Sequence, residues 1–134
     1  MRRRYFVLAI IPAIGLGVAR NLPPANAAME APFTQDAFTA AQKAGKPILV
    51  DITAPWCPTC AAQKPILNKL AAEPAFKDMV ILRVDFDSRK DVVRALNARS
   101  QSTLIVYRGA NEVGRSVGDT NEASIAALLR KGLN

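Results

Sequence analysis

Cys57 and Cys60, the two cysteines of this 134-residue chain, are the residues best suited to chemistry, because only two residues separate them. Two thiols at this spacing can form a structural disulfide, act as a redox pair or supply half of a shared metal site. The sequence contains no histidine. It therefore excludes Cys-His and Ser-His nucleophile pairs and histidine metal ligands, and two cysteines are too few for a four-cysteine zinc site.

The cysteines lie between a predicted strand and a predicted helix. Residues 48–52 form a nearly continuous apolar run, which is typical of a strand covered on both faces. The segment Trp56–Cys60 then leads into a helix that is expected to end at about Ala72, with Pro65 as a kink inside it. Cys57 is thus expected at a helix N-terminus, where unpaired backbone N–H groups and the helix dipole stabilise a thiolate.

This placement predicts different roles for the two thiols. Cys57 is expected to attack a substrate disulfide, and Cys60, one turn into the helix, is expected to resolve the mixed disulfide. Asp51 interrupts the apolar strand, so its carboxyl group should have a raised pKa and could take the proton of Cys60. The alternatives that stay open are an inert structural disulfide and a strand-end carboxylate in water.

The rest of the pattern predicts an α/β domain with a mixed sheet. Residues 28–33 are expected to be a short lead-in. The predicted helices run from the cap Thr34 to about Ala44, from the cap Ser88 to about Asn97, and from the cap Thr120 to Lys131. The predicted further strands are residues 79–86, 103–107 and 113–117, the last two forming a hairpin. Strand–helix–strand crossovers give parallel pairing and the hairpin adds an antiparallel part, with helices on both faces.

The first 27 residues have the three-part layout of a secretory signal peptide. The cluster Arg2–Arg4 precedes an apolar run over residues 5–19, and the small residues of Ala25–Ala27 predict cleavage after Ala27. The alternative is an uncleaved anchor, although a membrane span needs about 20 apolar residues. Both arrangements predict an exported domain of residues 28–134 in a periplasm, whose leader engages the membrane only during export or as an anchor.

The net charge of +7 does not indicate a nucleic-acid partner. Four arginines belong to residues 1–27, and the rest of the chain has 14 basic and 11 acidic residues, a net charge of +3. These charges are interspersed, as in Arg89-Lys90-Asp91, and do not form a stripe. The pattern favours a solvated surface and no binding of nucleic acid.

Residues 48–67 resemble the active-site segment of thioredoxins, and the likeness extends over most of residues 33–133. It is carried by an aspartate six residues before the first cysteine, a tryptophan directly before it, a proline eight residues after it, and a basic residue on the following strand. These residues are Asp51, Trp56, Pro65 and Arg83. Residues 43–47 are also similar to the lead-in of small exported members and of the C-terminal domain of the transmembrane thiol:disulfide interchange protein.

The resemblance implies a thioredoxin fold, with a mixed central sheet of about four to five strands and helices on both faces. It implies a thiol–disulfide oxidoreductase that uses a redox-active disulfide, Cys57–Cys60, without a cofactor or a metal. The function that it implies is the reduction of disulfides in exported proteins, with electrons from a membrane thiol-reductant conductor. A fold does not identify a substrate by itself.

Two departures from thioredoxins bear on the chemistry. Pro58-Thr59 stands where thioredoxins have Gly-Pro, and such dipeptides tune reduction potentials between about −270 and −120 mV, so the direction of electron flow stays open. Ser102 stands where they carry a cis-proline facing the cysteines. A non-proline cis bond costs about 2.5–4 kcal/mol, so a trans bond is expected before Ser102, whose hydroxyl could bind the Cys57 thiolate. The expected motif and substrate contacts are Trp56, Pro58, Thr59, Ser102 and Thr103.

Other functions compete with a reductase. The chain could be a disulfide oxidant, or a redox-inert scaffold that uses the fold only for contacts. Two thiolates that are not faced by the cis-proline of thioredoxins could also hold Cu(I), or share an iron–sulfur cluster across a dimer. The sequence offers no third ligand motif for such a site, and the methionine nearest to the cysteines is Met79.

Overall fold

Strand β2 (Pro47–Thr53) forms at the apolar run that the sequence predicts, and its five inner residues are all buried. The computed structural model describes residues 27–133. Within them, β2 pairs in parallel with β3 (Val80–Asp85) and antiparallel with β4 (Thr103–Arg108). A strand with neighbours on both sides and helices over both faces has no solvated side, which explains why its sequence is almost wholly apolar.

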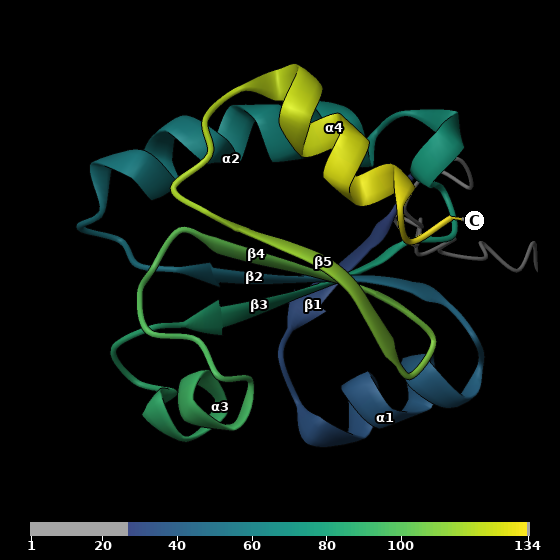
Figure 1. Ribbon diagram of the computed structural model, residues 1–134, viewed down its shortest axis with the longest axis horizontal. Coiled ribbons are helices and arrows are strands. Elements are labelled where there is room, and N and C mark those ends of the chain that lie inside the picture. Colours follow the sequence, from purple (N-terminus) through teal and green to yellow (C-terminus); the bar gives the residue numbers. More distant parts are fainter. Residues whose placement is uncertain (1–26, 134) are drawn as a thin grey trace, which may run out of the picture.

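The sheet has five strands in the order β1-β3-β2-β4-β5 (Figure 1). Strand β5 (Asn111–Val117) forms the predicted hairpin with β4. Strand β1 (Met29–Pro32) pairs in parallel with β3 at the opposite edge, so the prediction of a mere lead-in over residues 28–33 was wrong. Its four residues are mostly exposed and lack the apolar alternation on which a strand prediction depends.

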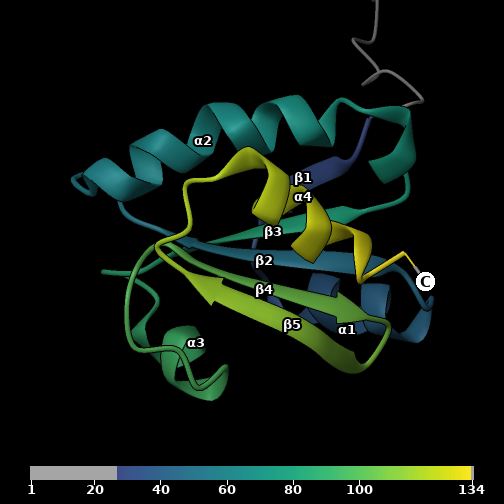
Figure 2. The same ribbon diagram turned by 45° about the horizontal axis from the view of Figure 1, so that its top comes forward.

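Helices cover both faces of the sheet (Figures 1 and 2). Helices α2 (Pro58–Ala71) and α4 (Glu122–Arg130) pack on one face, over side chains such as Leu49 and Ile81. Helices α1 (Gln35–Lys43) and α3 (Lys90–Ala95) pack on the other face, over side chains such as Ile48 and Val50. A short 3-10 helix, η1 (Pro74–Phe76), follows α2. The predicted α/β class, with four to five strands and helices on both faces, is confirmed.

The helix caps correct two details. Thr34 caps α1 as predicted, because its hydroxyl accepts a hydrogen bond from the backbone N–H of Ala37. The predicted cap Ser88 is wrong: its N–H and its hydroxyl both donate to Asp85, and α3 begins only at Lys90. The predicted cap Thr120 is wrong too, because its neighbour Asn121 caps α4. Adjacent short polar side chains offer equivalent capping groups, so sequence alone does not choose between them.

The predicted signal peptide lies outside the described residues, except for its last residue, Ala27. Ala28 already belongs to the core, and its N–H donates to the carbonyl of Ala71 at 2.8 Å. Over residues 27–133, no helix has both the length and the apolar character that a membrane crossing requires.

Candidate active site

Cys57 occupies the N-cap position of α2, and Pro58 is the first residue of the helix. The Sγ atom of Cys57 accepts a hydrogen bond from the backbone N–H of Cys60 at 3.1 Å. Proline suits the first helical position, because the N–H that it lacks would have no partner within the helix. The thiol therefore takes the place of a capping oxygen, where the free N–H groups and the helix dipole favour a negative charge.

Both cysteines are free and buried, with 3% of Cys57 and 6% of Cys60 exposed. Burial by itself raises the pKa of Cys57, but hydrogen bonds from the Cys60 side chain, from Ser102 and from the backbone outweigh it, so the pKa lies below its ordinary value. A lowered pKa increases the fraction of thiolate, which is the attacking species in disulfide exchange.

Ser102 lies against both sulfur atoms. Its Oγ is 3.1 Å from Sγ of Cys57 and 3.1 Å from Sγ of Cys60, and its side chain is buried. The peptide bond before it is trans, as expected, since the described residues contain no cis peptide bond. Its φ of +61° is in the left-handed region, which is uncommon for any residue with a side chain. This backbone conformation places the hydroxyl between the two thiols.

Gln63 fixes the loop that carries Ser102, a role that was not predicted from the sequence. Its side chain is 1% exposed, and its Nε2 donates to the carbonyl oxygens of Asp119 at 2.8 Å and Ser102 at 3.4 Å. The N–H of Gly118 also donates to the Ser102 carbonyl, at 2.9 Å. A signal existed: Gln63 is a polar residue within the buried stripe of α2 that also includes Leu67.

Asp51 and Cys60 line the same pocket, which has a volume of about 480 Å³. Its lining also includes Cys57, Lys64 and Arg83. Arg83 lies opposite Asp51 in the β2–β3 register, with its Nε 3.8 Å from the Asp51 carboxylate and its Nη2 3.3 Å from Glu30. Burial raises the pKa of Asp51 to about 6, against the lowering effect of Arg83. The structure thus provides a carboxyl group that can exchange a proton near neutral pH, in the pocket that Cys60 lines.

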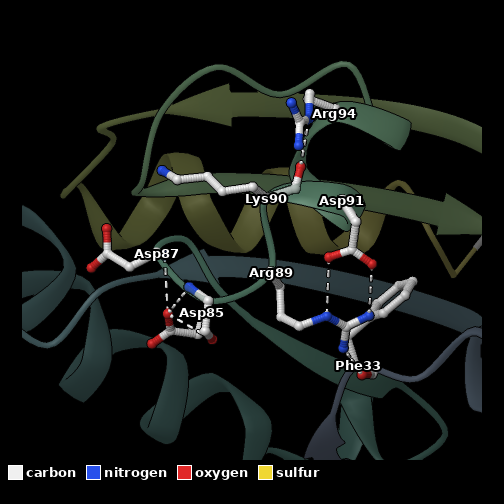
Figure 3. Close-up of polar contacts among 8 residues, drawn as sticks. Phe33, Asp85, Asp87, Arg89, Lys90, Asp91 and Arg94 are labelled. Atoms are coloured by element: carbon white, nitrogen blue, oxygen red, sulfur yellow. Dashed lines mark hydrogen bonds and ion pairs between the residues drawn. The ribbon is translucent and has the colours of Figure 1, made fainter.

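Trp56 presents an exposed ring next to Cys57, with 57% of the residue accessible. Its Nε1 donates to Asp87 Oδ2 at 2.6 Å. Figure 3 shows the turn after β3 that carries Asp87, in which the carboxylate of Asp85 accepts the backbone N–H groups of Asp87 and Ser88. The role of Asp87 was not predicted, because 31 residues separate it from Trp56. The held ring offers an apolar contact beside the nucleophile.

The other predicted motif residues have different surroundings. Pro58 is exposed and Thr59 is half-buried at the start of α2. Thr103 is 1% exposed, and its hydroxyl donates to the carbonyl of Ser100 at 2.7 Å, so its side chain holds the loop before β4. No group of three or more cysteine, aspartate, glutamate or histidine side chains suited to a metal ion occurs in the part of the chain that the structure describes.

Comparison with known proteins gives a consistent result. The family model described as Thioredoxin matches residues 30–131. The chain is 33% identical to a thioredoxin of Mycobacterium tuberculosis over 102 residues, which cover 76% of this chain and 81% of that protein. It is 35% identical to a thioredoxin of Chlamydia muridarum over 98 residues, which cover 73% of this chain and 93% of that protein.

Solved structures agree with the family model. The crystal structure of Trxlp from Edwardsiella tarda EIB202 superposes with a TM-score of 0.73 and 41% identity, over 76% of this chain and 98% of that chain. The thioredoxin of Malassezia sympodialis superposes with a TM-score of 0.69 over 79% of this chain and 91% of that chain. Its identity is only 19%, so it supports the fold alone.

Proposed function

Because the chain belongs to the thioredoxin family and carries the paired cysteines of a thiol–disulfide oxidoreductase, we propose that it reduces disulfides in exported proteins. The observation that carries the proposal is the pocket shared by Asp51 and Cys60. Cys60 must lose a proton before it can release a reduced substrate, and the carboxyl group of Asp51, with a pKa of about 6, can accept that proton near neutral pH.

The reaction begins with the thiolate of Cys57 at the N-terminus of α2. It attacks one sulfur of a substrate disulfide, a Cys57–substrate bond forms, the substrate S–S bond breaks, and the other substrate sulfur leaves as a thiolate. The exposed ring of Trp56 and the adjacent start of α2 form the surface that meets the substrate in this step.

Cys60 completes the reaction. Its proton passes towards Asp51, and the resulting thiolate attacks the sulfur of Cys57. The Cys57–Cys60 bond forms while the bond to the substrate breaks, so the second substrate sulfur also leaves as a thiolate and takes up a proton. The substrate has gained two electrons, and the protein has lost two.

The electron donor that we propose is a membrane thiol-reductant conductor, which would restore the dithiol by the reverse exchange. The proposal extends the expectation, drawn from the sequence of Lys43–Pro47 alone, that this segment resembles one of the transmembrane thiol:disulfide interchange protein. In cells that lack such a conductor, alkylation of free thiols should find Cys57 and Cys60 oxidised. If they stay reduced there, the donor is a different one.

The direction of electron flow is tested by the reduction potential. We expect a value below about −220 mV for a reductase, measured by equilibration with a thiol–disulfide buffer of known potential. A value near or above −150 mV would assign the chain to the oxidants instead.

The proposed location is a periplasm, after cleavage of residues 1–27. Cleavage after Ala27 would leave every residue from Ala28 onwards, including the start of β1, in the mature domain. Cell fractionation followed by mass determination tests this proposal. A protein that retains residues 1–27 in the membrane fraction would show an anchor, and one found in the cytoplasm would end the proposal of export.

Trapping identifies the substrates. In Cys60→Ser, the resolving thiol is absent, so Cys57 should remain in mixed disulfides with its partners, which mass spectrometry can identify. The double variant Cys57→Ser/Cys60→Ser is the matched control and should trap nothing. Failure of Cys60→Ser to trap any exported protein would argue strongly against the proposed function.

A further inference from the structure

We propose that the hydroxyl of Ser102 is a catalytic hydrogen-bond donor that serves the two active-site sulfurs in turn. It stabilises the thiolate of Cys57 before the first exchange and the thiolate of Cys60 during the second. This inference rests on the proposed roles of Cys57 and Cys60. It adds to them a residue that holds the charge on whichever sulfur is about to attack.

The geometry of the reduced site carries the inference. The Oγ of Ser102 is 3.1 Å from both sulfur atoms, which is within hydrogen-bonding distance for sulfur in each case. A serine hydroxyl has one hydrogen to donate and two lone pairs that accept. It can therefore donate to only one sulfur at a time, while the other sulfur, as a thiol, donates to it.

In the dithiol state this constraint gives a defined arrangement. The hydroxyl of Ser102 donates to the thiolate of Cys57, and the one hydrogen of the Cys60 thiol is shared between Ser102 Oγ and that thiolate. The backbone N–H of Cys60, at 3.1 Å from Cys57 Sγ, supplies a second donor to the same thiolate. The Cys57 pKa lies below its ordinary value because the hydrogen bonds of this cluster outweigh the effect of burial.

The arrangement reverses in the second step. Once Cys57 is bonded to the substrate sulfur, it no longer carries a charge and is a poor acceptor. Cys60 has then passed its proton to Asp51 and needs a donor in its place. A rotation of the Ser102 hydroxyl about its Cβ–Oγ bond suffices to turn the hydrogen from Cys57 to Cys60, because both sulfurs are equally distant. Ser102 keeps its own proton throughout.

The backbone around Ser102 keeps the hydroxyl in this place. The residue has a φ of +61°, which costs conformational energy for a side chain larger than glycine. The carbonyl of Ser102 accepts hydrogen bonds from the N–H of Gly118 at 2.9 Å and from the amide of Gln63 at 3.4 Å. These contacts hold the strained conformation, and the buried site keeps bulk water from competing for the sulfurs.

The test compares Ser102→Ala with Ser102→Gly. Both variants lack the hydroxyl, but glycine also relieves the backbone strain. In both, the midpoint of the Cys57 thiolate titration, followed by ultraviolet absorbance, should rise by about one pH unit, a tenfold effect that is typical of a lost hydrogen bond to a charged group. Since the reduced form loses stabilisation, the reduction potential should become about 30 mV more negative when measured at a pH above both titration midpoints, which is the same tenfold factor.

A kinetic readout tests the second half of the proposal. The mixed disulfide between Cys57 and a fluorescent peptide should decay about tenfold more slowly in both variants, as seen in single-turnover experiments. Ser116→Ala is the matched control, because the Ser116 hydroxyl is buried without a hydrogen-bond partner among the described residues. It should leave the titration midpoint, the potential and the decay rate as in the original protein.

The outcomes separate the alternatives. If Ser102→Gly departs from the original protein while Ser102→Ala does not, relief of the backbone strain is the cause and the proposed hydrogen bonding is wrong. If the titration midpoint shifts but the decay rate does not, the hydroxyl serves Cys57 alone. Failure of the original protein to reduce any protein disulfide would refute the proposed function, while the thiolate titration would still measure the contribution of Ser102.

Discussion

The buried carboxyl group of Asp51 serves the proposed proton transfer but lowers the stability of the folded protein at neutral pH. Burial raises the pKa of its carboxyl group from an ordinary 3.8 to about 6. The folded protein therefore binds a proton at Asp51 more tightly than the unfolded chain does. Below pH 3.8 the carboxyl group is protonated in both the folded and the unfolded state, so it does not lower the free energy of unfolding. The free energy of unfolding falls as the pH rises from about 4 to 6, and above pH 6 it is lower by the full amount of roughly 3 kcal/mol.

We therefore predict that Asp51→Asn stabilises the protein at pH 8 and slows its reaction. Unfolding in urea should give a free energy higher by roughly 2–3 kcal/mol at pH 8, with little gain at pH 4. Arg83 keeps Glu30 as a partner at 3.3 Å in this variant. Decay of the mixed disulfide should lose its dependence on a group that titrates near pH 6. An equal gain in stability at both pH values would contradict the assigned pKa.

Trp56 should matter to large substrates only. We predict that Trp56→Ala changes the unfolding free energy by less than about 0.5 kcal/mol, because the ring is largely exposed. The same variant should reduce a protein disulfide several-fold more slowly and a small-molecule disulfide at an unchanged rate. Met29→Ala, equally exposed but at the far edge of the sheet, is the control and should affect neither rate. Equal losses on both substrates would mean that the ring acts on Cys57 itself.

At the scale of single residues, the sequence could predict those whose surroundings are local. Cys57 and Cys60 follow from their spacing and from the helix that begins beside them, and Asp51 follows from its place in an apolar strand. Gln63 could be noticed as a polar residue in the buried stripe of α2, but neither its partners nor the role of Asp87 could be found in this way. Their partners, Asp119 and Trp56, are 56 and 31 residues away, and only the assembled fold brings them into contact.

Helix α2 connects the active site to two loops that come from the other end of the chain. Through Gln63 it holds the loop before β4 and the loop after β5, because the amide bonds to carbonyls of Ser102 and Asp119. The difference between local and distant contacts also explains which strands could be predicted from the sequence. Apolar runs in the sequence predict the buried strands. Strand β1 is short and exposed, and it is stabilised by its pairing with β3, which no local sequence pattern predicts.

We predict that Gln63→Leu is destabilising and also raises the Cys57 titration midpoint. Loss of its hydrogen bonds to the buried carbonyl of Ser102 and the half-buried carbonyl of Asp119 should cost about 1–3 kcal/mol in urea unfolding. The titration midpoint should move in the same direction as in Ser102→Ala, but by less. In the double variant Gln63→Leu/Ser102→Ala the shifts should not add, since Gln63 acts only through Ser102. Additive shifts would show that Gln63 influences the thiolate by a separate route.

At the scale of the whole molecule, the sheet divides the core into two layers, and the edge strand β1 is the first element within residues 27–133. It contributes four residues of pairing with β3 and Glu30, the second partner of Arg83, and the buried Ala28 directly precedes it. The proposed boundary between leader and domain, after Ala27, would thus fall directly before an element that the fold uses.

We predict a sharp boundary for N-terminal deletion. The chain that lacks residues 1–27 should melt at a temperature close to that of the full chain. The chain that lacks residues 1–32 should melt roughly 5–15 °C lower, because it loses β1 and exposes part of β3. Thermal unfolding followed by circular dichroism measures both. Equal melting temperatures would mean that β1 contributes little to the fold.

The parallel pairing of β1 also determines where anything joined to the N-terminus will sit. Met29 and Ile48 both lie level with Val80, whereas Cys57 follows the opposite end of β2, beyond Thr53. The five steps from Ile48 to Thr53 span about 17 Å. A dye, an affinity tag or a solid support attached ahead of β1 would leave the cysteines facing away from the attachment point. The protein should therefore keep its thiol exchange when it is immobilised by that end.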